Sequence, residues 1–438
     1  MNKLLVTSLL LGSQLAVAQS TLKPLISVRA NEIESKVVSW RRDLHQHPEL
    51  GNQEFRTAKI VADHLKSLGL EVQEGIAVTG VVGILRGDKP GPVVALRADM
   101  DALPVNERVD VPFKSTVMTE YNGQKTGVMH ACGHDTHVAM LMGVAEVLTG
   151  LKKDLAGTVK FIFQPAEEGV YDTKEAFGAN AMVQAGVLEN PKVDAIFGLH
   201  INSQTPVGVI AYRPGATMAA VDQLRIRLKG KQTHGAYPWS GVDPIVTASQ
   251  VVMGLQTIVS RNVMLTENPA VVTVGAIHGG IRNNIIPEQV EMIGTIRTLG
   301  KEQRLLVHQR IEQISKNIAE SAGATADVTI DHGYPVTYND PALTDMMEET
   351  LYEVAGKDQV RIVPAAMGAE DFSYFQEKIP GFFFFLGGMD PTKKASEVAP
   401  HHTPDFYIDE SGFDLGIKAL ASLVVDYNQK KMAPAKKK

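Results

Sequence analysis

The densest group of chemically reactive residues is the run from His130 to His137, which reads HACGHDTH and contains Cys132, the single cysteine among 438 residues. A thiolate and several imidazoles are the ligands that zinc and similar divalent metals prefer. Gly133 lets the backbone turn sharply between two such ligands. The alternative is a structural histidine cluster around a buried free thiol, because free cysteine is commonly a small core residue. The density of ligand types favours a metal site.

Further candidate ligands follow apolar, β-branched runs that predict strands. Glu167 and Glu168 come after the run 159–163, Asp99 and Asp101 after 93–98, and His200 after 195–199. Active sites of open α/β sheets gather at the carboxyl ends of strands, so we expect these side chains to meet in one crevice. There, one glutamate could bind metal while its neighbour accepts a proton. Taken alone, the glutamate pair would suit a solvated turn as well.

Two histidines near the C-terminal end could complete the ligand set. His401 and His402 precede Pro404, whose fixed φ stiffens an extended loop and would hold an imidazole in place. The spacing does not decide which of the two histidines is the ligand.

The elements that must position these residues alternate between strand and helix patterns. Helical spacing at 58–68 and 135–148 interrupts the apolar runs, which predicts an α/β fold with a mixed sheet and helices on both faces. Within 216–330, four strand patterns and two helix patterns follow one another in the order of a ferredoxin-like α+β unit. We therefore predict a discontinuous catalytic domain over 19–215 and 331–438, with the α+β unit inserted between its segments.

The first 18 residues have the pattern of a secretory signal peptide. Lys3 precedes the apolar run 4–11, and the small residues 16–18 resemble a cleavage site. This run is too short to span a bilayer, and no later stretch approaches the apolar length that a transmembrane helix needs, so we expect an exported, periplasmic or secreted protein without a membrane span. The composition is globular, with 44% hydrophobic and 21% charged residues, and the net charge of −6 argues against nucleic acid as a partner.

Taken together and in order, the motifs resemble those of the aminoacylase and glutamate-carboxypeptidase type of metallopeptidases, in the branch of hippurate hydrolase and the plant indole-acetyl-amino-acid hydrolases. The resemblance runs from about Arg41 to Phe406. It rests on LHQHPE at 44–49, LRADMD at 96–101, HACGHD at 130–135, QPAEEG at 164–169, GLH at 198–200, HG at 234–235, NIIP at 284–287, MGAED at 367–371 and HTPDF at 402–406.

The resemblance implies two divalent metal ions per subunit, zinc or manganese, with cobalt or nickel as further choices. The implied ligands are Cys132, His134, Glu168, His200 and His402. Compared with the wider clan, Cys132 stands in the place of a bridging carboxylate and Asp99 in that of a ligand histidine. A thiolate favours softer metals and carboxylates harder ones, so these departures leave the metal open.

The resemblance also implies roles for residues outside the ligand set. Glu167 would be the general base, and Asp101 would orient a ligand such as His134. His234, from the lid of a neighbouring subunit, would stabilise the oxyanion, although a surface-loop histidine would also fit its sequence context. Asn284 would contact substrate. The inserted unit would form a homodimer or a higher homo-oligomer.

The expected activity is hydrolysis of the amide bond of small, hippurate-like N-acyl amino acids by metal-activated water. A carboxypeptidase or dipeptidase acting on short peptides is the enzymatic alternative. A non-catalytic metal- or ligand-binding protein is the alternative from another class, and an intact Glu167 speaks against it. Arg282 or Arg297 could pair with a substrate carboxylate or form an ordinary ion pair.

Overall fold

The computed structural model describes residues 22–171 and 175–433. The predicted signal peptide at 1–18 lies outside these residues. The Cα positions divide the chain into two compact units. Unit 1 contains the chain up to Gly215, Asn339–Val363 and the chain from Tyr374, and unit 2 contains Ala216–Tyr338 and Pro364–Ser373. None of the helices in the described ranges is long and apolar enough to cross a membrane.

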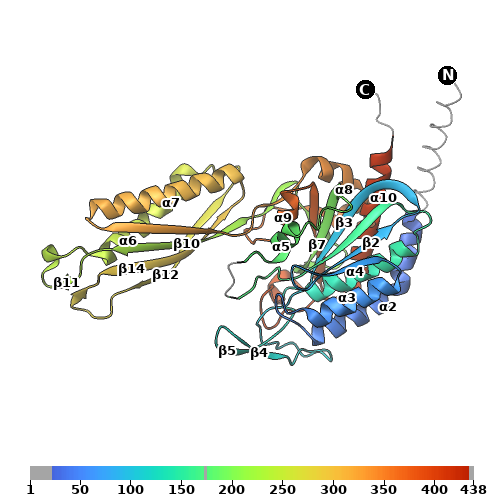
Figure 1. The fold of residues 1–438 in the computed structure, drawn as a ribbon, viewed down its shortest axis with the longest axis horizontal. Coiled ribbons are helices and arrows are strands. Elements are labelled where there is room, and N and C mark those ends of the chain that lie inside the picture. The colour runs from blue at the N-terminus through green and yellow to red at the C-terminus, as the bar shows by residue number, and fades with distance from the viewer. Residues whose placement is uncertain (1–21, 172–174, 434–438) are drawn as a thin grey trace, which may run out of the picture. The chain divides into compact units, whose positions relative to one another are not determined.

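Unit 1 is built on an eight-stranded mixed sheet (Figure 1), which confirms the predicted fold class. β6, β3, β7 and β18 are parallel neighbours at its centre, so their carboxyl ends lie along one edge. β1 and β2 pair antiparallel beside β6, and β8 runs antiparallel to β18. The strands lie in the order β1 (Glu71–Ile76), β2 (Gly80–Arg86), β6 (Ala156–Gln164), β3 (Lys89–Asp99), β7 (Ala195–Pro206), β18 (Gly381–Met389), β8 (Ile210–Tyr212) and β17 (Val360–Ile362).

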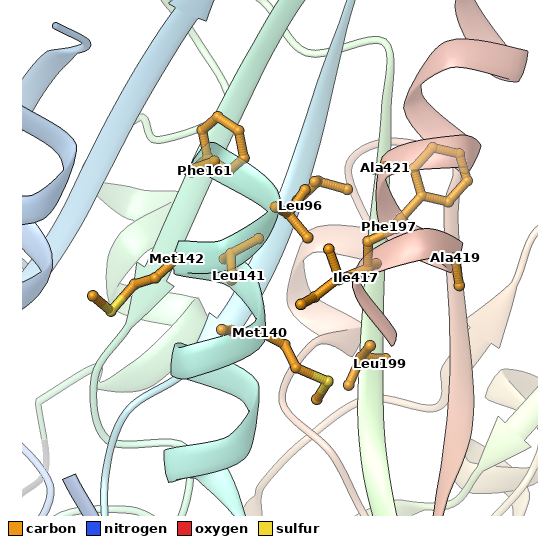
Figure 2. Close-up of a cluster of buried hydrophobic side chains, with 14 of the residues drawn as sticks. Leu96, Met140, Leu141, Met142, Phe161, Phe197, Leu199, Ile417, Ala419 and Ala421 are labelled. Atoms are coloured by element: carbon orange, nitrogen blue, oxygen red, sulfur yellow. The ribbon is translucent and has the colours of Figure 1, made fainter. Parts of the chain in front are cut away.

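The main core of unit 1 packs α2, α3, α4 and α10 against one face of this sheet, because it takes alternate residues of the central strands. Successive residues of β6 and β18 are buried, the burial expected of central parallel strands. Figure 2 shows Leu141 of α4 and Ile417 of α10 packed with Leu96 of β3 and Phe197 of β7. The helices of unit 1 are α2 (Leu22–Gln46), α3 (Phe55–Ser67), α4 (His134–Thr149), α5 (Gly178–Gln184), α8 (Pro341–Ala355) and α10 (Phe413–Met432), and β4 (Met118–Tyr121) and β5 (Gln124–Gly127) form a hairpin.

Unit 2 is a four-stranded antiparallel sheet with two helices, in the ferredoxin-like order that the sequence predicts. The sheet order is β12-β14-β10-β15. Burial alternates along β10, and its inward residues pack with α6 and α7. The elements follow one another as β10 (Ala220–Lys229), β11 (Thr233–His234), α6 (Pro244–Thr257), β12 (Ala270–Gly279), β13 (Ile285–Ile286), β14 (Gln289–Thr298), α7 (Lys301–Ser321) and β15 (Thr325–His332).

The boundary of unit 2 differs from the predicted insert at 216–330. β15 continues to His332, and Val221 N–H then donates to the carbonyl of Tyr334 at 3.0 Å. Ala366 N–H donates to the carbonyl of Thr217 at 2.9 Å. Because these backbone pairs hold them, residues 331–338 and 364–373 belong to unit 2 rather than to the predicted catalytic segment 331–438.

Candidate metal centre

The candidate ligands of unit 1 gather where the central parallel strands end. Asp99 is the last residue of β3, and the turn with Glu167 and Glu168 follows Gln164, the last residue of β6. His200 lies inside β7 rather than after it, because pairing with Phe385 of β18 continues this strand to Pro206. The predicted strand end at 199 is therefore wrong, but the histidine still reaches the same crevice.

Gly133 shapes the segment between Cys132 and His134. It has a φ of +94° and precedes α4, which begins at His134. A Cβ at this position would lie 2.4 Å from Cγ2 of Ile201, so no other residue fits without displacement. The glycine thus allows a buried thiol and the first side chain of a core helix to enter one site.

The structure brings all five predicted metal ligands and Glu167 together. Cys132 Sγ lies 3.3 Å from His200 Nε2 and 3.3 Å from His402 Nε2, and His402 Nε2 is 3.0 Å from Glu168 Oε1. His134 Nε2 is 4.0 Å from Glu167 Oε2. These side chains form three overlapping groups in which the ligand atoms lie within 4.8 Å of one another: Cys132, His134 and His200; Cys132, Glu168 and His402; and His134, Glu167 and Glu168.

Hydrogen bonds give the adjacent residues His401 and His402 different roles in the site. Ser203 N–H donates to His401 Nε2 at 3.2 Å, so the ring proton of His401 is on Nδ1, which lies 3.7 Å from Cys132 Sγ. His401 is therefore a donor to the sulfur. His402 has a φ of +63°, and its own N–H donates to the carbonyl of Ala131 at 2.8 Å, which fixes its unusual backbone. His402 is the histidine with Nε2 directed to both Cys132 and Glu168.

His137 and Asp99 lie within ligand distance of His134, but hydrogen bonds already occupy them. Ile201 N–H donates to His137 Nε2 at 2.8 Å, so His137 Nδ1–H donates to Asp99 Oδ1 at 2.5 Å. Arg97 donates to the other oxygen of Asp99 at 2.6 Å. These residues therefore support the site around the ligands. Sequence reasoning missed Arg97 and His137 in this role, although an arginine inside an apolar strand was an available signal.

Asp101 connects the turn that carries Glu167 and Glu168 to His134. Its Oδ1 accepts a hydrogen bond from Glu167 N–H at 3.0 Å and lies 3.3 Å from His134 Nδ1. Its Oδ2 accepts from Glu168 N–H at 2.8 Å. A single buried carboxylate thus fixes two consecutive amides and one candidate ligand.

The charges of the site fit a bound cation. Burial alone would lower the pKa of His134, but Asp99 and Asp101 outweigh it and raise the pKa to about 10. Burial, then nearby His137, keep the pKa of His200 well below its usual range, so this ring is neutral and can offer a lone pair. Among the described residues, His134 Nε2 is buried without a hydrogen-bond partner. An excess of carboxylates around an orphaned nitrogen, a thiol and a neutral imidazole suits divalent metal ions.

His234 and Asn284, the predicted residues outside this cluster, lie next to each other in unit 2. His234 pairs with Ile285 across β11 and β13, and Gly235 N–H donates to the carbonyl of Asn284 at 2.8 Å. Ala236 N–H donates to His234 Nδ1 at 3.0 Å, so the exposed ring carries its proton on Nε2. His234 is thereby fixed as a hydrogen-bond donor. Arg282 and Arg297 also belong to unit 2.

Comparison with known proteins extends over nearly the whole chain. A family model described as peptidase family M20/M25/M40 matches residues 95–426. Thermostable carboxypeptidase 2 of Saccharolobus solfataricus is 42% identical over 401 residues, which cover 91% of this chain and 97% of that protein. IAA-amino acid hydrolase ILR1-like 4 of Arabidopsis thaliana is 37% identical over 428 residues, with 97% and 93% covered. Among solved structures, the Bacillus subtilis YXEP protein, described as a dinuclear metal binding peptidase from the M20 family, superimposes with a TM-score of 0.75 at 36% identity and covers 91% of this chain and 99% of its own.

Proposed function

Because the chain belongs to peptidase family M20/M25/M40, we propose that it hydrolyses the amide bond of small N-acyl amino acids of the hippurate type. The protein is a metal-dependent hydrolase of the amidohydrolase and carboxypeptidase kind. The observation that carries this proposal is the carboxylate of Glu167, which lies within 4.8 Å of the candidate ligand atoms of His134 and Glu168.

We propose that two divalent metal ions bind in this site. Zinc or manganese fits the mixed donor set best, and cobalt or nickel would also be accepted. When bound, such ions act as Lewis acids that lower the pKa of water towards about 7 and stabilise negative charge on a carbonyl oxygen. The residues that would hold them are Cys132, His134, Glu168, His200 and His402.

In the proposed reaction, Glu167 moves the proton. Its carboxylate takes a proton from the attacking water and later gives it to the nitrogen of the leaving amine. The side chain is 8% exposed, and the Asp101 carboxylate holds its backbone amide, so the base is both sheltered and fixed. Asp101 also orients His134, which links the base and a ligand through one group.

The proposal assigns charge stabilisation and substrate contact to unit 2. The Nε2–H of His234, from unit 2 of a neighbouring subunit, would donate to the oxyanion that develops on the amide carbonyl, because its Nδ1 is already occupied by Ala236 N–H. Asn284, which shares the β11–β13 ribbon with His234, would contact the substrate. We further propose that unit 2 mediates a homodimer or higher homo-oligomer, which sedimentation analysis of the purified protein tests.

The deciding experiment compares substrate classes and removes the base. Metal-loaded protein is assayed by liquid chromatography against N-acyl amino acids and dipeptides, with and without chelator. We expect chelator-sensitive release of the amino acid, faster from hippurate-like substrates. Glu167→Gln should lower kcat by roughly a hundredfold or more while the bound metal, measured by elemental analysis, stays unchanged.

The alternatives predict other outcomes of the same panel. Faster cleavage of dipeptides would favour a carboxypeptidase or dipeptidase, a function that the 42% identity to thermostable carboxypeptidase 2 supports. An absence of turnover on every substrate, with metal bound, would favour a non-catalytic binding protein and contradict the proposal.

We also propose that the protein is exported to the periplasm or the medium, on the leader pattern of residues 1–18. N-terminal sequencing of the protein from culture fractions tests this. A mature chain that starts after Ala18 supports export, and an intact leader in a cytoplasmic fraction contradicts it.

A further inference from the structure

Two glutamates of the segment that leads into α3 have different tasks. Glu49 accepts hydrogen bonds from the N–H groups of Arg56 at 2.9 Å and Thr57 at 2.8 Å, so its side chain satisfies the first turn of the helix. Glu54 occupies the N-cap position of the same helix, but its side chain makes no capping hydrogen bond. The carboxylate of Glu54 is therefore used elsewhere.

Glu54 reaches the turn that carries Glu167 and Glu168. Its Oε1 accepts a hydrogen bond from Ala166 N–H at 2.8 Å, and its Oε2 accepts one from the Thr79 hydroxyl at 2.5 Å. Glu54 is 0% exposed and Thr79 is 2% exposed, so both bonds lie in the interior. A buried carboxylate with two matched donors is costly to remove, because each donor would lose its partner.

The turn needs such support because its backbone is strained. Ala166 has a φ of +51°, in the left-handed region that residues with a side chain seldom adopt. Asp101 accepts the next two amides, those of Glu167 and Glu168. Two buried carboxylates thus hold three consecutive N–H groups. A Cβ at Gly51 would lie 2.4 Å from the carbonyl oxygen of Gly169, so the segment before Glu54 packs directly on the same turn.

We propose that Glu54 is a positioning residue that fixes the Ala166 amide and, through the turn, the placement of the base Glu167 and the ligand Glu168. This inference rests on the proposed function. Glu54 touches neither substrate nor metal in this proposal, and it acts only through the backbone of the turn.

The surroundings of Glu54 define a conservative variant. Burial and the nearby Asp101 raise the pKa of Glu54 to about 7. A glutamine offers an oxygen to Ala166 N–H and an NH₂ group to the Thr79 oxygen, and it adds no charge beside Asp101. Glu54→Gln should therefore preserve the turn, whereas Glu54→Ala removes both contacts.

The test compares four proteins: wild type, Glu54→Ala, Glu54→Gln and the matched control Glu49→Ala, which lies in the same segment but contacts no part of the turn through its side chain. We expect Glu54→Ala to lower kcat by roughly ten- to a hundredfold with KM changed less than about threefold. Glu54→Gln should stay within about threefold of wild type in kcat. Glu49→Ala should lower the melting temperature but keep kcat. Equal kcat in Glu54→Ala and wild type, or equal losses in Glu54→Ala and Glu49→Ala, would overturn the proposal.

A metal-binding measurement separates this inference from the proposed function. Calorimetric titration with Mn²⁺ or Zn²⁺ should show that Glu54→Ala weakens one of two binding events by roughly ten- to a hundredfold, even where no substrate is turned over. Unchanged affinity of both binding events would overturn the proposal.

If Glu54→Ala does not fold, Thr79→Val serves instead, since it removes one of the two contacts of Glu54. A severalfold loss in kcat or affinity supports the proposal, and wild-type values contradict it.

Discussion

At the residue scale, the partners of each histidine's second nitrogen distinguish ligands from supports. His200 donates its Nδ1–H to the carbonyl of Ile201 at 2.6 Å, which leaves the Nε2 lone pair directed at Cys132. His137 and His401 instead accept a backbone N–H on Nε2. Their remaining nitrogens are donors and cannot bind a metal ion in that state.

This difference predicts the behaviour of the adjacent pair His401 and His402. His402→Ala should lose about one equivalent of bound metal, because it removes a ligand. His401→Phe should keep both equivalents with affinity reduced roughly ten- to a hundredfold, since only a donor to Cys132 Sγ is lost. Elemental analysis after dialysis against metal-free buffer measures both. Loss of an equivalent in His401→Phe but not in His402→Ala would reverse the assignment.

At the scale of elements, Gly133 connects the metal site at the strand ends to His134, the first residue of α4. Gly133→Ala places a Cβ 2.4 Å from Ile201 Cγ2 at a φ of +94°, so it should cost about 2–4 kcal/mol of unfolding free energy and weaken metal binding. Gly69→Ala is the matched control. Its φ is +77° with nothing within 4 Å of the added Cβ, so it should cost only about 1 kcal/mol and leave metal binding unchanged. Urea unfolding and metal titration of both variants check this, and equal effects would show that the contact with Ile201 is unimportant.

In unit 2, Asp222 of β10 connects the sheet to α7. Its carboxylate accepts hydrogen bonds from Arg304 Nε at 2.9 Å and from His308 Nε2 at 2.7 Å. Burial would raise the pKa of Asp222, but these hydrogen bonds outweigh burial and hold the pKa below the ordinary value of 3.8. A depressed pKa means that the carboxylate stabilises the fold above its ordinary pKa and that this contribution is lost as the pH falls below it.

We therefore expect the wild type to lose unfolding free energy as the pH drops below about 4, and Asp222→Asn to lose less over the same interval. At neutral pH the variant should be less stable by about 1–3 kcal/mol, because the partners of a buried carboxylate are left poorly paired. Chemical denaturation between pH 3 and pH 7 measures both effects. Parallel pH curves for the two proteins would contradict this role of Asp222.

How much of the fold and of the site the sequence predicts depends on whether a feature is set by a local pattern or by a contact between distant residues. Strand periodicity identified the central strands, and ligands at the strand ends identified the crevice. The choice between His401 and His402 depends on the amide of Ser203, and the task of Glu54 depends on the amide of Ala166, far along the chain in each case. The extension of unit 2 by 364–373 likewise depends on backbone pairing with Thr217. Such long-range contacts produce no periodicity and no compositional signal in the sequence, so only the structure reveals them.

At the scale of the whole molecule, bound metal should contribute to stability. Binding to the folded state alone adds about 2.7 kcal/mol when free metal is a hundredfold above Kd. Treatment with chelator should lower the melting temperature in calorimetry, and dialysis into zinc or manganese should restore it. Cys132→Ala should show a smaller chelator effect, since a shared ligand is missing. A melting temperature that does not respond to chelator in the wild type would contradict a metal centre at this position.

The strand order of unit 1 has a consequence for synthesis on the ribosome. β18 (Gly381–Met389) pairs with both β7 (Ala195–Pro206) and β8 (Ile210–Tyr212), yet it emerges only after the whole of β10 to β15 has been translated. Until then β7 keeps an unpaired edge rich in apolar residues, which is open to pairing with other chains. A chain that lacks Gly381 and the residues after it should therefore expose this edge and associate with other chains more readily than the full-length protein.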